Sequence, residues 1–144
     1  MASIVYDSFL ADVFAGNCTT AHSYQAMLVS SSYAENRATH TKRSDITNEI
    51  SGTGYSAGGA AVTLSATLDT TAHKLTLSIG SVSWSSSTLT ARKLIVYRAR
   101  GGASSADELV CCIDNVTDLT SSSSTMAWNT PNATTWEIPL PAPI

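Results

Sequence analysis

Apolar and polar side chains alternate most clearly in the middle of the chain. Apolar residues occupy every second position from 62 to 68 and again from 75 to 79, with serine or threonine between them. A period of two is typical of a strand with one buried face. The polar residues 69–73 between the two segments therefore predict a hairpin turn, and Val82 and Trp84 extend the second strand on the same face.

Other segments are predicted to be strands because apolar side chains dominate them: 24–29, 89–98, 108–114, 125–129 and 134–138. Around 94–97 and in 108–114 both faces are apolar, which is typical of a strand at the centre of a sandwich or beneath a partner. The four serines at 121–124 predict a loop before the last two strands.

Helical signals are few and short. Residues 7–14 predict a short helix that ends at Gly16. Ser44 or Asp45 is predicted to cap a single helical turn that runs to Glu49. Residues 30–43, between the predicted strand at 24–29 and this helical turn, are predicted to form a long polar loop.

Seven or eight short strands with frequent turns predict an all-β fold, an antiparallel β-sandwich of jelly-roll-like form. The 144 residues are expected to form a single domain, 1–144. Within it, 1–22 are expected to form an N-terminal arm with the short helix. Residues 139–144 are expected to form an extended tail, because Pro139, Pro141 and Pro143 do not continue sheet pairing.

Charge is scarce along the chain and narrows the range of partners. Charged residues make up 13% and apolar residues 43%, with a net charge of −3. Serine and threonine fill the polar positions, and such faces lose their water at low cost when they meet a neighbour. The densest basic run is Lys42-Arg43, so we expect no nucleic-acid partner. No apolar run is long enough for a membrane span, and the N-terminus has no basic region typical of a signal peptide.

The three cysteines do not predict a disulfide framework, because their number is odd and two of them are adjacent. In a strand, Cys111 and Cys112 point to opposite faces, so at least one of them is expected to be buried. Metal ligation needs a set of histidine or cysteine partners at ligand spacing, and the sequence offers no such set, so we expect no metal and no cofactor.

Residues 54–58 match the G-x-S-x-G pattern of esterases. That motif works on a sharp strand-to-helix turn followed by an acid and a histidine. Here the next segment is a strand, and the only later histidine is His73 in the predicted hairpin turn. The glycines are instead expected to supply positive φ and close packing in a structured loop. The acidic residues are scattered, so we expect no catalytic residues and no enzyme activity.

Aromatic residues and one polar cluster are the candidates for contact with a partner. Trp84, Trp128 and Trp136 fall on predicted strands, where they either pack in the core or anchor an interface. Tyr55 in the glycine-rich segment is a further interface candidate. His40 and Arg43, together with Asp45, either order the loop by hydrogen bonds or contact a partner.

Several of these segments carry a resemblance to known proteins. Residues 24–29, 47–59, 82–84 and 87–97 resemble a set of small virion proteins of tailed bacteriophages, and the block 48–59 is the most specific. The similarity covers roughly residues 24–114. Residues 98–102 depart from the pattern, so contacts made by that turn are not carried over.

The resemblance implies a structural virion protein that is assembled in the host bacterial cytoplasm. Length and β-content look similar to capsid decoration, or cement, proteins, which bind the major capsid protein and stabilise the shell. The alternatives are a neck, tail or fibre-associated adaptor and, from a different class, a carbohydrate-binding receptor module that stacks exposed tryptophan on sugar rings. We also expect the protein to form a homo-oligomer.

Overall fold

The protein folds mainly into antiparallel β-structure. The computed structural model describes residues 3–128, 135–140 and 142. These residues form a five-stranded sheet of order β1-β7-β6-β2-β3 and a three-stranded sheet of order β4-β5-β8. The prediction of an all-β, sandwich-like fold is therefore confirmed, and its jelly-roll-like form stays a prediction.

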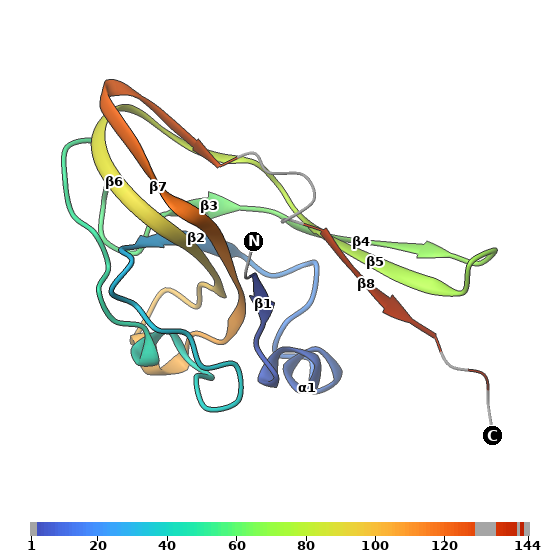
Figure 1. Ribbon diagram of the computed structural model, residues 1–144. Helices are drawn as coiled ribbons and strands as arrows, with labels where there is room; N and C mark the ends of the chain where they lie inside the picture. The colour runs from blue at the N-terminus through green and yellow to red at the C-terminus, as the bar shows by residue number, and fades with distance from the viewer. Residues whose placement is uncertain (1–2, 129–134, 141, 143–144) are drawn as a thin grey trace.

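Figure 1 shows the order of the elements along the chain, with long loops on both sides of the first 3-10 turn. The elements are β1 (Ile4–Val5), α1 (Ser8–Phe14), β2 (Tyr24–Val29), a 3-10 turn (Arg43–Asp45), β3 (Ala60–Val62), β4 (Leu64–Asp69), β5 (Lys74–Ile79), β6 (Val82–Arg98), a second 3-10 turn (Ser104–Ala106), β7 (Leu109–Trp128) and β8 (Thr135–Pro139).

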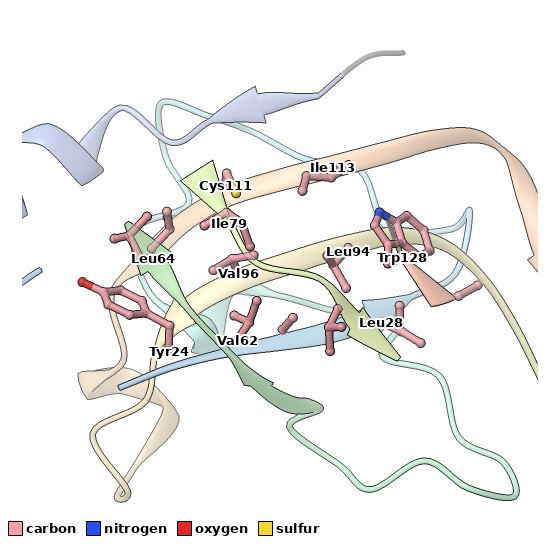
Figure 2. Packing of buried hydrophobic residues seen from close by; sticks show 14 of the residues in the cluster. Tyr24, Leu28, Val62, Leu64, Ile79, Leu94, Val96, Cys111, Ile113 and Trp128 are labelled. Carbon is pink, nitrogen blue, oxygen red and sulfur yellow. The ribbon is translucent and has the colours of Figure 1, made fainter. Parts of the chain in front are cut away.

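The main core lies between the two sheets. Leu94 and Val96 of β6 and Ile113 of β7 face the small sheet, which contributes Leu64 and Ile79 (Figure 2). These side chains come from four strands of the two sheets. Their packing attaches the root of the three-stranded sheet to the five-stranded sheet.

A second core covers the opposite face of the five-stranded sheet. There Ile95 and Tyr97 of β6 and Cys112 of β7 pack against Tyr6 and Tyr33 from the segments on either side of β2. The prediction of double-faced central strands is thus confirmed. Cys111 lies in the main core and Cys112 in the second core, so the two adjacent cysteines do point to opposite faces and both are buried.

The predicted serine loop at 121–124 is wrong, because these residues lie within β7. Segments 108–114 and 125–129 were expected as separate strands, yet β7 runs without a break from Leu109 to Trp128. Ser121 Oγ lies 2.8 Å from Ser87 Oγ, and the Ser87 hydroxyl also donates to the Ser124 carbonyl at 3.0 Å. Buried hydroxyls therefore bond to each other across two strands where loop residues were expected.

Irregular pairing bends the two long strands over the main core. The register between β6 and β7 shifts at several points, including between Trp84 and Ser87. Ser86 and Ser123 both adopt positive φ. Bulges of this kind increase local twist and curvature, and Figure 1 shows the far end of the β6–β7 pair curling across the top of the molecule.

Two further local predictions need correction. Helical geometry covers only Arg43–Asp45 and does not reach Glu49, which instead forms a bridge with Val29. The predicted helix at 7–14 is confirmed as Ser8–Phe14. Residues 4 to 14 do not form a free arm, however, because β1 pairs with β7 and Phe9 of α1 lies in the main core.

The start of the proline-rich tail also differs from the prediction. Pro139 is the last residue of β8 and stands opposite Lys74, and the Leu140 amide donates to the His73 carbonyl at 2.9 Å. Sheet pairing thus continues past the first proline. Pro141, Pro143 and Ile144 lie outside the described residues.

Candidate functional site

The three-stranded sheet has one apolar and one polar face. In the register of the sheet, Leu64 stands opposite Ile79, Ala66 opposite Leu77 and Leu68 opposite Leu75, while Leu77 and Leu75 also face the strand β8. Since side chains alternate along each strand, one face carries the following residues: Leu64, Ala66, Leu68, Leu75, Leu77, Ile79, Trp136 and Ile138. The other face carries Ser65, Thr67, Thr76 and Ser78 with the Lys74–Glu137 ion pair.

The apolar face is covered at its root and uncovered at its tip. Leu64 at the root of β4 is 7% exposed, whereas Leu68 at the tip of the same strand is 58% exposed. Figure 1 shows the reason, because β4, β5 and β8 project to one side beyond the five-stranded sheet. The small sheet therefore presents an apolar surface that the described residues do not cover.

The helix α1 lies next to this surface and adds to it. Leu10 and Phe14, four residues apart on the helix, share one side, and Phe14 is 90% exposed. Phe9 points inward, with its ring edge-on to Trp136 at 6.0 Å between centroids. Contact between Phe9 and Trp136 joins α1 to the small sheet.

A hollow of about 450 Å³ lies between α1 and β8. Leu10, Trp136 and Ile138 supply apolar lining, while Asp7 and Arg37 form an ion pair of 2.8 Å at its wall. We call the hollow and its neighbouring apolar side chains the apolar surface patch. It consists of Leu10, Phe14, Leu68, Leu75, Trp136, Ile138 and Leu140.

The tryptophans divide between the core and this patch. Trp84 and Trp128 are buried in the main core and so are not on the surface to stack on a sugar or a partner. Trp136 is half-buried and lines the hollow. Of the three tryptophans predicted as interface candidates, Trp136 alone reaches an open surface.

Tyr55 fixes the glycine-rich loop to the five-stranded sheet. Its hydroxyl donates to Glu49 Oε1 at 2.7 Å and accepts from the Leu28 amide at 3.0 Å, while the Gly58 amide donates to the same carboxylate oxygen at 2.6 Å. Burial raises the pKa of Tyr55, so the phenol stays protonated. The role visible for Tyr55 is to order the loop.

The same loop makes the closest approach of two backbone segments. Gly59 has a φ of +86°, and a Cβ added there would lie 1.8 Å from the Ala26 carbonyl oxygen. No other residue type fits this position without moving β2. The expectation that the glycines supply positive φ and close packing is confirmed.

His40 and Arg43 each bond within the chain. His40 Nδ1 lies 2.9 Å from the Tyr33 hydroxyl, which in turn lies 2.8 Å from the Tyr6 hydroxyl. Arg43 donates to Asp107 at 2.8 Å and lies over the Tyr97 ring. These contacts order the 30–50 segment against the second core, and each side chain remains partly exposed.

Buried ion pairs hold the same segment at two further points. Lys93 donates to Glu35 and to the Tyr33 carbonyl. Burial pushes the pKa of Glu35 upward, but the bond and charge of Lys93 and a bond from the Glu35 backbone together outweigh this and leave the pKa below its usual range. Glu108 is likewise paired, with Arg100 at 2.5 Å and Lys42 at 3.6 Å. The buried carboxylates of Glu35 and Glu108 are thus each paired with a cation of the same chain.

The residues that the structure describes offer no converging set for catalysis or metal binding. Ser56 lies in the glycine-rich loop, whereas His73 is at the β4–β5 turn on the other sheet. No three ligand-type side chains of histidine, cysteine, aspartate or glutamate come together in the described ranges. The one helix of those ranges is too short to cross a membrane.

Sequence reasoning missed most of the apolar surface patch. Leu10, Phe14 and Leu68 were placed on a helix and on a strand but not recognised as exposed. The spacing of Leu10 and Phe14 was a usable signal, since four residues is one helical turn. The exposure of Leu68 had no local signal, because its alternation continues unchanged from the buried Leu64.

No protein-family model, curated protein or solved structure matches this chain.

Proposed function

We propose that this chain is a non-enzymatic structural protein of a tailed-phage virion, most specifically a capsid decoration protein that binds the major capsid protein. The observation that carries the proposal is the apolar surface patch. Among the described residues, four of the five most exposed large apolar side chains belong to this patch: Leu10, Phe14, Leu68 and Leu140.

Apolar surface of this kind is unusual on a protein that stays alone in solution. Contiguous exposed patches, particularly those with a polar rim, mark protein–protein contact sites. Here Phe14 and Trp136 supply the large side chains that anchor interfaces, with Asp7 and Arg37 at the edge. The hydroxyl-rich polar faces add surface that loses water cheaply when a neighbour covers it.

The rest of the fold is suited to a structural component of a particle. Two cores and a loop tied down by Tyr55 and Glu49 leave a rigid body. Shape change on binding costs free energy, so a rigid body presenting a fixed apolar patch binds without that cost. The similarity of segments 24–29 and 48–59 to small phage virion proteins supports a place in the particle.

Copy number and a matched pair of surface variants test the proposal. Virions purified from the phage or prophage that encodes the chain are expected to contain it in hundreds of copies, measured by quantitative mass spectrometry against the major capsid protein. Phe14→Ser should lower the copy number at least about tenfold, since a buried aromatic anchor contributes about 2 kcal/mol or more.

Val116→Ser provides the control, because Val116 is 53% exposed but lies on β7 outside the patch. It should leave the copy number unchanged. About a dozen copies per particle would indicate a neck or tail adaptor and contradict the decoration role. Absence of the chain from purified particles would overturn a virion role altogether.

A further inference from the structure

The outer strand β4 has a sequence that is nearly the same in both directions. From Leu64 to Leu68 it reads leucine, serine, alanine, threonine, leucine, with Ala66 at the centre. In an antiparallel pair of two such strands centred on Ala66, Leu64 stands opposite Leu68 of the second copy and Ser65 opposite its Thr67. Each position therefore meets a side chain of the same kind, which a two-fold symmetric contact requires.

The backbone of β4 also has hydrogen-bonding groups on its outer side that no strand of the described residues uses. The Gly80 amide donates to the Thr63 carbonyl at 2.9 Å, so the main-chain groups of Thr63 face β5. Since these groups alternate in an antiparallel pair, the amides and carbonyls of Leu64, Ala66 and Leu68 face away from β5. No strand of the described residues pairs with β4 on that side.

The other outer strand of the small sheet, β8, is protected where β4 is not. The Leu140 amide donates inward to His73, so by alternation Pro139 faces outward, where its missing N–H removes no bond within the sheet. Proline and charge are the usual means of blocking an edge strand, and β8 carries both in Pro139 and Glu137. Between Leu64 and Leu68, β4 carries neither.

We propose that β4 pairs antiparallel with β4 of a second copy, centred on Ala66, so that two three-stranded sheets become one six-stranded sheet. Antiparallel pairing brings the exposed tip of each strand beside the covered root of the other. Leu68, which is 58% exposed, then lies next to Leu64 of the second copy, which is 7% exposed in its own chain. The pairing covers the outermost leucine of both chains at once.

Charge does not oppose this contact. The paired segment 64–68 is uncharged, and Asp69 stands opposite Thr63 of the second copy. The two Asp69 side chains are then separated by about six strand positions, or roughly 20 Å. That distance exceeds the screening length of about 8 Å at physiological salt.

The size of the contact sets the expected affinity. Pairing of one six-residue strand covers less than the roughly 800 Å² per partner of a standard interface. We therefore expect a weak dimer with a dissociation constant on the order of 10–100 μM. This inference does not rest on the proposed function, because the edge of β4 is distinct from the face that carries Phe14 and Trp136.

Sedimentation velocity on the full chain tests the dimer. Between about 5 and 500 μM the weight-average mass should rise from that of the 15.1 kDa monomer toward twice that value. Ala66→Lys places two like charges opposite each other on the axis and should raise the dissociation constant at least about tenfold. Ala127→Lys, the same change at an exposed position of β7, should leave it unchanged.

Cross-linking of Ala66→Cys tests the register and does not depend on the lysine variant folding. Residues that face each other in a hydrogen-bonded antiparallel pair have Cα atoms about 5.5 Å apart, within the range for a disulfide. Copper–phenanthroline with dioxygen as oxidant should join two chains through residue 66, while Ala127→Cys should stay monomeric under the same treatment. The three native cysteines are buried.

Three results would overturn the proposal. The first is a monomer at every concentration of the unmodified chain. The second is an Ala66→Lys variant that dimerises as tightly as the unmodified chain. The third is a dimer that gives no cross-link through residue 66.

Discussion

The two sheets are built from the same alternation of apolar and polar residues but are covered to different extents. In the five-stranded sheet, both faces of β6 at 94–97 and of β7 at 109–113 lie under other segments, and side chains such as Leu94 and Ile95 are almost completely buried. In the three-stranded sheet, one face is polar and the other loses its cover halfway along β4.

The difference follows from what each sheet has for neighbours. The five-stranded sheet has the small sheet and α1 on one face and the 30–50 segment on the other. The small sheet has the five-stranded sheet at its root only. Stability is therefore concentrated in the five-stranded sheet and its two cores. The surface open to contact is concentrated at the tip of the three-stranded sheet and beside α1.

Leu94→Ala should give the largest loss of stability. Leu94 is 1% exposed in the main core, and removal of a buried leucine leaves a cavity that costs about 3 kcal/mol. Urea denaturation followed by tryptophan fluorescence would measure it, since Trp84 and Trp128 report on the same core. A loss below about 1 kcal/mol would contradict the close packing between the sheets.

Glu108→Gln should cost about 2 kcal/mol at pH 7, because it removes charge-assisted hydrogen bonds from Arg100 to a buried carboxylate. Burial acts to raise the pKa of Glu108, but the bond from Arg100, a bond from the Glu108 backbone and the charges of Lys42 and Arg100 together outweigh it, and the pKa lies below its usual 4.5. The unfolded chain thus takes up this proton first as the pH falls.

The stabilising effect of Glu108 is therefore complete above about pH 4.5 and is lost as the pH falls below it. The stability gap between the unmodified chain and the variant should narrow over that range. Denaturation curves from pH 7 to about pH 3 would show this. A gap of equal size at both ends would mean that the charge of Glu108 does not stabilise the fold.

Tyr33→Phe should cost about 1–2 kcal/mol of folding stability, because the buried Tyr6 hydroxyl loses its 2.8 Å partner.

Burial also raises the pKa of Tyr33 to about 12, above its usual 10.0. The unfolded phenol ionises first, so stability from this group falls as the pH rises from 10 to 12, and the variant should lack that part of the decline. In a double-mutant cycle, Tyr6→Phe should add much less to Tyr33→Phe than it costs alone.

Leu68→Ala should have the smallest effect, within about 0.5 kcal/mol, because its side chain is already in water. It is the same substitution as Leu94→Ala on the other sheet, and measurement at a concentration where the chain is monomeric makes the two comparable. A loss as large as that of Leu94→Ala would show that the tip is covered by residues outside the described ranges.

Much of the secondary structure was readable along the chain. The strands at 24–29 and 64–69, the turn at 69–73 and the helix at 8–14 agree closely with the pattern, because a period of two or of about 3.6 is a local property. The opposite orientation of Cys111 and Cys112 was equally local. The conformation of the glycine-rich loop also followed from its composition, since Gly59 occupies a backbone conformation that other residues rarely adopt.

Cross-strand contacts decided the rest. The serines at 121–124 looked like a loop because their sequence contains no apolar signal, yet they lie in a strand because Ser87 across the sheet bonds to Ser121. The apolar surface patch was equally hidden, since Leu64 and Leu68 occupy equivalent places in the same alternation. The sequence by itself determined which side chains share a face, because neighbouring residues set that, whereas the tertiary structure decided which faces are covered, because cover comes from segments far away in the chain.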